Sequence, residues 1–229
     1  MIEDPPLLTV RRNFPRPNAE QIAAFTGAQS GHVIDAMNGR GGLDHTIKPV
    51  DPETASFCGV AVPCWAGPND QLAIYAALDA AQPGDVILCA SEGYVGSAIV
   101  GDMLTGMMRN GGMVGFVTDG AVRDTVGIID VGLPCFAAAV TPNSCARNGP
   151  GTAGLPINMG DVQVSAGDII VADIDGVVVV PFARIDDTIG QLANVRAAEA
   201  TLEAKVKGGL VVPEFVTELL KSGRVKQVD

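Results

Sequence analysis

The sequence predicts an α/β fold in which parallel strands come first and antiparallel strands follow. Between residues 55 and 118, short apolar runs alternate with segments of helical period, which is typical of βαβ units and a parallel sheet. After residue 166, two apolar runs flank Asp175-Gly176, a pair that favours a β-hairpin. A long helical segment follows the hairpin. We therefore expect mixed parallel and antiparallel strands and a long C-terminal helix.

The first half of the chain opens with residues 1–20, which are rich in Pro, Arg and Asn and are expected to form an N-terminal arm. After it, short apolar runs bounded by Gly, Pro or Asp predict strands, and apolar residues repeated every three or four positions predict helices. Asn69 or Asp70 is a suitable cap for one helix. The expected elements are helices at 30–37, 69–81 and 97–110 and strands at 55–62, 86–90 and 114–118.

The second half is expected to contain strands at 167–172 and 177–180, a long helix at 186–207 and a short helix from Pro213. The GxGxxG match at Gly149–Gly154 follows no clear strand and opens no helix, so we interpret it as a loop. No linker interrupts the chain, and its 229 residues predict a single domain over residues 1–229.

The charge balance argues against two classes of partner. The chain has 15 Lys and Arg against 26 Asp and Glu, a net charge of −11. Surfaces that bind nucleic acid or anionic membranes are basic, so neither partner is expected. No apolar run approaches the roughly 18–20 residues of a membrane span, and the acidic N-terminus does not resemble a signal peptide. We expect a cytoplasmic protein, and its 47% apolar content supports a core.

The cysteines predict buried free thiols. Their number is odd and they form no CxxC pair, so neither a disulfide framework nor a zinc ribbon is supported. The two histidines are too few for a His-rich metal site, and no metalloprotease or P-loop motif is present. Carboxylates and arginines remain, which suits a hard, oxygen-binding metal such as Mg²⁺ or Mn²⁺. The cysteines are Cys58, Cys64, Cys89, Cys135 and Cys145.

The most informative stretch runs from Gly93 to Asp124. Asp102 lies in a predicted helix with no cation three or four positions away, so its carboxylate needs another partner. A structural alternative is a hydrogen bond to a backbone turn. Arg123 and Asp124 follow a short strand and a Gly turn, where α/β folds present their sites. Their structural alternatives are a surface charge for Arg123 and a helix N-cap for Asp124.

Twenty residues separate Asp102 from Arg123-Asp124. This Asp-x20-Arg-Asp spacing, with the phrases at 115–124 and 167–181, resembles the signature of the RraA-like family over roughly residues 25–210. More narrowly, it resembles the class II 4-hydroxy-4-methyl-2-oxoglutarate/4-carboxy-4-hydroxy-2-oxoadipate aldolases. The resemblance implies a β/β/α sandwich of the swivelling-domain type. It also implies a homotrimer or homohexamer with sites at subunit interfaces.

The resemblance also implies site residues. Asp124 would hold Mg²⁺ or Mn²⁺ together with waters, Arg123 would bind the pyruvyl group, and Asp102 would lie beside the metal waters. Glu199, or Glu203 one turn further on, would reach the site of the neighbouring subunit, with a solvated helix face as the alternative. The pyruvate carboxylate would be held by backbone amides around Gly101, Asp102, Met103 and Leu104.

These roles fit cleavage of a 4-hydroxy-2-oxo acid to pyruvate and a second oxo acid. The charge that develops on the C2 oxygen of the pyruvate enolate suits a Lewis acid and a fixed cation at Arg123. A water oriented by Asp102 is the candidate base for the C4 hydroxyl proton. Oxaloacetate decarboxylation passes through the same enolate. The alternatives are a non-enzymatic regulator that binds an RNase, a methyltransferase, and lyase chemistry on another oxo acid.

Overall fold

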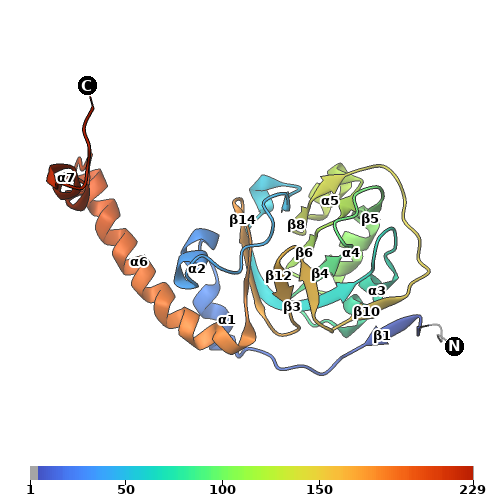
Figure 1. Cartoon of the computed structure of the whole chain (residues 1–229). Coiled ribbons are helices and arrows are strands. Elements are labelled where there is room, and N and C mark those ends of the chain that lie inside the picture. Colours follow the sequence, from blue (N-terminus) through green and yellow to red (C-terminus); the bar gives the residue numbers. More distant parts are fainter. Residues whose placement is uncertain (1–4, 229) are drawn as a thin grey trace. The chain divides into compact units, whose positions relative to one another are not determined.

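The structure is a computed structural model that describes residues 5–228. Its main sheet is built around a nine-residue strand, β3 (Phe57–Trp65) (Figure 1). On one side of β3, three strands follow in parallel order: β4 (Asp85–Ala90), β6 (Gly115–Thr118) and β8 (Cys135–Ala137). On its other side, β10 (Gly151–Ala153) and β13 (Ile169–Asp173) pair antiparallel with its two ends. The expected mixture of parallel and antiparallel strands is confirmed.

Three outer strands complete this sheet. β1 (Leu8–Val10) pairs with β10, β2 (Lys48–Pro49) pairs with β8, and β14 (Gly176–Val180) forms the expected hairpin with β13. The predicted N-terminal arm therefore contributes a strand, because backbone groups of residues 8–10 find partners along β10. Residues 1–4 of that arm lie outside the described residues.

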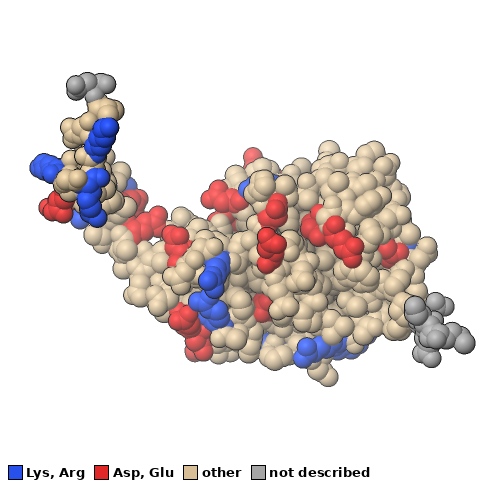
Figure 2. Space-filling model, in the orientation of Figure 1, with Lys and Arg blue, Asp and Glu red and all other residues tan. Residues whose placement is uncertain are grey.

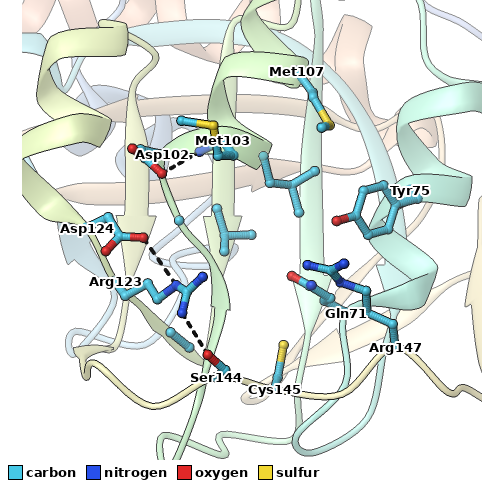
Figure 3. Close-up of a pocket in the computed structure, with 14 residues that line it drawn as sticks. Gln71, Tyr75, Asp102, Met103, Met107, Arg123, Asp124, Ser144, Cys145 and Arg147 are labelled. Carbon is cyan, nitrogen blue, oxygen red and sulfur yellow. Dashed lines mark hydrogen bonds and ion pairs between the residues drawn. The ribbon is translucent and has the colours of Figure 1, made fainter.

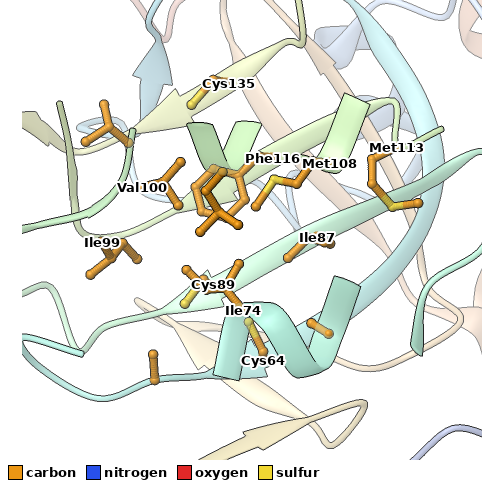
Figure 4. Packing of buried hydrophobic residues seen from close by; sticks show 14 of the residues in the cluster. Cys64, Ile74, Ile87, Cys89, Ile99, Val100, Met108, Met113, Phe116 and Cys135 are labelled. Atoms are coloured by element: carbon orange, nitrogen blue, oxygen red, sulfur yellow. The ribbon is translucent and has the colours of Figure 1, made fainter. Parts of the chain in front are cut away.

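The central strands are apolar throughout because both faces of the sheet are covered. Along β4, Val86 and Leu88 belong to one buried cluster, while Ile87 and Cys89 belong to the other. Helix α3 (Leu72–Ala80) packs in the cluster drawn in Figure 4, and the hairpin of β11 (Ile157–Met159) and β12 (Val162–Val164) packs in the opposite one. These layers agree with the expected β/β/α sandwich.

A second, three-stranded parallel sheet carries the sequence motif. It consists of β5 (Ala98–Val100), β7 (Ala121–Val122) and β9 (Ala139–Val140). Helix α4 (Asp102–Asn110) follows β5, and α5 (Thr125–Val131) follows β7. The helix predicted at 97–110 was therefore wrong in its first part. Residues 98–100 are completely apolar and pair with β7, which places them in a buried strand instead.

Two further predictions need correction. The segment at 149–154 is not wholly a loop, because residues 151–153 form β10 between β1 and β3. The helix predicted at 69–81 begins three residues later, at Leu72, and neither expected cap lies at its N-cap position. The remaining elements are α1 (Ala19–Phe25), α2 (Ser30–Ala36), and the 3-10 turns η1 (Pro52–Thr54) and η2 (Phe182–Arg184).

The chain divides into two compact units, Met1–Leu192 and Ala193–Asp229. The long helix α6 (Ile185–Lys207) is present as expected and begins in the first unit, where Ile185, Thr188 and Leu192 are buried. The second unit holds the rest of α6 and a short helix, α7 (Glu214–Lys221), which starts after Pro213 as predicted. Among the described residues of this second unit, none is buried.

The prediction of buried free thiols is confirmed in part. All five cysteines are free thiols; Cys64, Cys89 and Cys135 are buried, whereas Cys58 and Cys145 are half-buried. Within residues 5–228, no helix is both long and apolar enough to span a membrane. Figure 2 shows many acidic side chains on the face it presents, and Lys and Arg side chains both on the C-terminal segment and in separate groups on the rest of the chain. That segment, residues 193–229, holds 6 of the 15 basic residues, which leaves the first 192 residues strongly acidic.

Candidate active site

A pocket of about 230 Å³ opens where β5 and β7 end and the following segments begin (Figure 3). The carboxyl ends of parallel strands are a common place for ligand sites in α/β folds. Six site residues were predicted to come from the same subunit, and all six line this pocket. They are Gly101, Asp102, Met103, Leu104, Arg123 and Asp124. Residues separated by twenty positions thus meet because β5 and β7 are neighbours in the small sheet.

Asp124 has a left-handed backbone conformation, with φ 54° and ψ 45°. It stands at the N-cap of α5, as the structural alternative foresaw, but its side chain caps no helix amide. Only its carbonyl oxygen accepts a helix hydrogen bond, from the amide of Ile128 at 2.9 Å. Aspartate tolerates this conformation better than most residues, at a modest cost. The result is a carboxylate that faces the pocket and is 47% exposed.

Arg123 is held in place on both sides of its guanidinium group. Its Nε lies 3.2 Å from Oδ2 of Asp124, and its Nη1 donates a 2.7 Å hydrogen bond to Oγ of Ser144. Its backbone amide also donates to the carbonyl of Val100, at the end of β5. Arg123 is therefore a fixed cation in the pocket, not a mobile surface charge.

Asp102 is the first residue of α4, and its Oδ1 accepts a 2.7 Å hydrogen bond from the amide of Met103. The structural alternative for Asp102, a hydrogen bond to a backbone turn, is therefore partly correct. Two glycines leave room for the carboxylates. A Cβ at Gly101 would lie 2.7 Å from Oδ2 of Asp124, and one at Gly127 would lie 2.7 Å from Cβ of Asp102. Any larger residue at either position would displace a carboxylate.

The opposite side of the pocket was not predicted from the sequence. It is formed by Gln71 and Tyr75 of the α3 region and by Cys145 and Arg147 of a loop, whose Ser144 lies beside Arg123 (Figure 3). The Arg147 guanidinium lies 5.9 Å from the Tyr75 ring centre, within cation–π range. With the Gln71 amide oriented to satisfy its neighbours, its oxygen accepts from Arg147 and its nitrogen donates to the carbonyl of Ile99. In the sequence, this side of the pocket is indicated only by an arginine, Arg147, within a segment rich in turn-forming residues.

Burial raises the pKa of the Cys145 thiol, which lies on the same loop, and Arg147 and Arg123 offset part of that rise. The thiol is therefore mostly protonated near neutral pH. With Arg123 on one side and Arg147 on the other, the pocket presents two cations and two carboxylates, Asp102 and Asp124. This charge pattern suits a small anionic ligand and a divalent cation.

Comparison with known proteins identifies the relatives of the chain. A model of the RraA-like family, described as Aldolase/RraA, matches residues 30–179. The chain belongs to the RraA-like family. A Halalkalibacterium halodurans protein named "Putative 4-hydroxy-4-methyl-2-oxoglutarate aldolase" is 32% identical over 190 residues, which cover 83% of this chain and 90% of that protein.

Solved structures of RraA-like and other proteins have a similar fold. The Streptomyces coelicolor protein RraAS2, titled an unusual member of the RNase ES inhibitor RraA protein family, is 25% identical with a TM-score of 0.74. The alignment covers 83% of this chain and all of that one. An uncharacterized Pseudomonas syringae protein has a TM-score of 0.76 at 21% identity, over 86% and 97% of the two chains. The similarity to the Pseudomonas syringae protein supports the fold alone.

The donors in the pocket fit the divalent cation that the RraA-like resemblance implies. Within residues 5–228, no group of three or more His, Cys, Asp and Glu side chains is arranged to hold a metal ion. Mg²⁺, however, commonly binds through one or two carboxylates and keeps several waters. Asp124, with Asp102 lining the same pocket, offers such hard oxygen donors. The donor set therefore suits Mg²⁺ or Mn²⁺ and not a softer metal.

The two glutamates assigned by the resemblance lie in the second unit. Glu199 and Glu203 are exposed residues of α6, and Glu203 pairs with Lys207 at 2.5 Å. The residues that line the pocket all fall between 71 and 147. A glutamate supplied by a neighbouring subunit thus stays a prediction about the assembly.

Proposed function

We propose that this chain is a divalent-metal-dependent aldolase that cleaves a 4-hydroxy-2-oxo acid to pyruvate and a second oxo acid. The proposed substrates are 4-hydroxy-4-methyl-2-oxoglutarate and 4-carboxy-4-hydroxy-2-oxoadipate, and oxaloacetate would be decarboxylated at the same site. The observation that carries the proposal is the meeting of Asp102, Arg123 and Asp124 in one pocket. The name of the H. halodurans relative supports the same reaction.

The side chains fit the charges that develop in this cleavage. The C4 hydroxyl loses its proton, the C3–C4 bond breaks, and its electron pair passes to the pyruvyl part as an enolate. Negative charge then lies on the C2 oxygen, and Arg123 supplies a fixed positive charge for it. Asp102 orients the water that takes the C4 hydroxyl proton, and C3 takes a proton to give pyruvate. Loss of CO₂ from oxaloacetate leaves the same enolate.

Asp124 is the proposed ligand of Mg²⁺ or Mn²⁺, since its carboxylate caps no helix and faces the pocket. When bound, the dication supplies Lewis-acid stabilisation of the charge on the C2 oxygen. Arg123, whose Nε lies 3.2 Å from Oδ2 of Asp124, orients that carboxylate in the pocket.

The first turn of α4 is the proposed site for the C1 carboxylate of the substrate. Amides at a helix N-terminus have no acceptor within the helix and attract anions. One of these amides, that of Met103, donates to the Asp102 carboxylate at 2.7 Å, and this contact supports the proposal that the turn binds a carboxylate oxygen. The other amides in this turn are those of Asp102 and Leu104, and Gly101 precedes it.

Arg147 is the proposed partner of a second substrate carboxylate. Both proposed aldol substrates carry a further carboxylate beyond C4, and an arginine binds a carboxylate through two parallel hydrogen bonds. Arg147 lies across the pocket from Arg123 and Asp124 (Figure 3). Its contacts with Gln71 and Tyr75 orient the guanidinium before a ligand arrives.

A homotrimer or homohexamer with interface sites is also proposed. Apolar side chains are exposed on the outer faces of α4 and α5 beside the pocket, and others on the C-terminal unit, which buries none of its described residues. Exposed apolar clusters of this kind are typical of subunit contacts. Glu199 would be supplied to the neighbouring site in such an assembly. The exposed residues include Met103, Met107, Val126, Ile129, Val211 and Phe215.

The alternative is a protein-binding regulator that inhibits an RNase. The similarity to RraAS2 favours it, since that protein is titled a member of an RNase inhibitor family. A purified RNase E-type enzyme would then bind the chain, and no pyruvate would be released. The two readings therefore make opposite predictions in one set of assays.

The test is pyruvate release from oxaloacetate and from 4-hydroxy-4-methyl-2-oxoglutarate, with Mg²⁺ and with EDTA, on a sample whose mass is measured by light scattering. We expect metal-dependent release from both substrates and a mass of three or six chains. Asp124→Asn should reduce release at least a thousandfold, whereas Asp79→Asn, at an exposed residue that does not line the pocket, should not. No release from either substrate would overturn the aldolase proposal.

A further inference from the structure

A buried aspartate, Asp70, lies immediately before Gln71 and α3, but does not itself line the pocket. Only 6% of its surface is exposed. Its Oδ1 accepts a 2.8 Å hydrogen bond from the amide of Leu72, the first residue of α3. Its Oδ2 accepts from the amides of Asn148 and Gly149 at 2.5 and 3.1 Å. One carboxylate thus joins the start of a helix to a loop more than seventy residues away.

Backbone hydrogen bonds extend the same junction. The amide of Gln71 donates to the carbonyl of Ala146 at 3.1 Å, and the amide of Ala146 donates to the carbonyl of Asn69 at 2.8 Å. Residues 69–72 and 146–149 therefore lie side by side, with the Asp70 carboxylate between them. A carboxylate is costly to bury, and here three amide donors compensate for the lost water.

The two segments that Asp70 joins carry the second side of the pocket. Gln71 and Tyr75 come from the α3 segment, and Cys145 and Arg147 come from the loop. The Arg147 side chain contacts both residues of the α3 segment. Its position therefore depends on the register between the loop and the helix, which the Asp70 hydrogen bonds set.

We propose that Asp70 is a positioning residue that places Arg147 for the second carboxylate of the substrate. This inference rests on the proposed aldolase function. Without Asp70, the loop loses the acceptor for the amides on the C-terminal side of Arg147, at Asn148 and Gly149. The guanidinium then samples more positions, and each binding event must order it again. Arg123 also contacts the loop through Ser144, but that part of the loop has its own anchor, because the amide of Ala98 donates to the carbonyl of Asn143. The contact of Arg123 with Asp124 does not involve the loop, so the enolate chemistry is spared.

The test compares Asp70→Asn with Asp168→Asn. Asp168 is a matched control, because it is also buried and accepts two backbone amides, those of Ser165 and Phe182, but lies outside the pocket lining. Two substrates are used: 4-hydroxy-4-methyl-2-oxoglutarate, which has the second carboxylate, and 4-hydroxy-2-oxopentanoate, which lacks it. Hydrogen–deuterium exchange of peptides covering 143–150 measures the loop without reference to activity.

For Asp70→Asn, we expect the KM for the dicarboxylate to rise about tenfold, while kcat stays within about twofold. The KM for the monocarboxylate should not change. Arg147→Ala should produce the same pattern, and the double variant should add little to either change. Exchange over 143–150 should speed up in Asp70→Asn and stay at the wild-type rate in Asp168→Asn.

Unchanged exchange in the loop, an equal loss with both substrates, or the same pattern in Asp168→Asn would overturn the proposal. If the wild type releases no pyruvate from either substrate, the proposed function fails, and loop exchange still decides whether Asp70 holds the loop. If Asp70→Asn does not fold, Asp70→Ser serves in its place, since the hydroxyl retains an acceptor for the helix amide of Leu72.

Discussion

Aspartates at two places in this molecule have opposite surroundings. At the pocket, Asp124 is 47% exposed and contacts an arginine, and Asp102 accepts one amide of its own helix turn. At the start of β4 and before β13, Asp85 and Asp168 are 1% and 4% exposed. Asp85 binds Arg16 through both oxygens at 2.7 and 2.9 Å. The pocket carboxylates have few hydrogen-bond partners and line an open cavity, whereas the buried ones accept several hydrogen bonds that hold the fold.

The largest effect that would test this comparison is at Asp124. Asp124→Gly removes the carboxylate and also relieves the left-handed backbone conformation, which glycine adopts without strain. We expect turnover to fall at least a thousandfold while the free energy of unfolding stays equal or rises by up to about 1 kcal/mol. Steady-state kinetics and chemical denaturation measure the two quantities. A large loss of stability would show that Asp124 holds the fold, against the comparison.

Asp85 should give the reverse result. Asp85→Asn breaks a buried ion pair and leaves Arg16 without its partner, so unfolding should become easier by about 3 kcal/mol. Turnover per folded molecule should stay near the wild-type value. Asp79→Asn is the matched control, because its pair with Arg12 is exposed and is expected to contribute about 0–1 kcal/mol. Equal effects of the two variants would contradict the difference drawn between buried and exposed carboxylates.

The smallest effect concerns pH and Asp173. Burial acts to raise the pKa of this carboxyl, but hydrogen bonds from Ser30, Asp175 and Gly176 together hold the pKa below its usual value of 3.8. A lowered pKa means that the stabilisation is present above the unfolded-state pKa and is lost as pH falls through the folded-state pKa. Asp173→Asn should therefore lower the free energy of unfolding by about 1–2 kcal/mol at pH 7.

The difference between wild type and Asp173→Asn should shrink below pH 3.8, and denaturation at several pH values measures it. A difference that stays constant between pH 7 and pH 2.5 would mean that the charge of Asp173 contributes nothing. Asp173 would then resemble the exposed pair at Asp79 and not the buried carboxylates.

The sequence by itself determined the mixed strand order, the hairpin at Asp175-Gly176, the long C-terminal helix and the family. Alternation of apolar residues and turn chemistry are local, so they are visible along the chain. The spacing of Asp102, Arg123 and Asp124 also identified one side of the pocket. Even here the boundary was wrong, since residues 98–100 are apolar enough for either element and only their pairing with β7 made them a strand.

Only the tertiary structure decided the other side of the pocket. Arg147 lies in a loop whose composition predicts a turn and nothing more, and its neighbours Gln71 and Tyr75 are more than seventy residues away. Their meeting depends on backbone hydrogen bonds between residues 69–72 and 146–149 and on one buried carboxylate, Asp70, which the sequence predicted only as a possible helix cap. A local pattern specifies what a segment prefers, whereas the contacts between distant segments form only when the sheet brings their ends together.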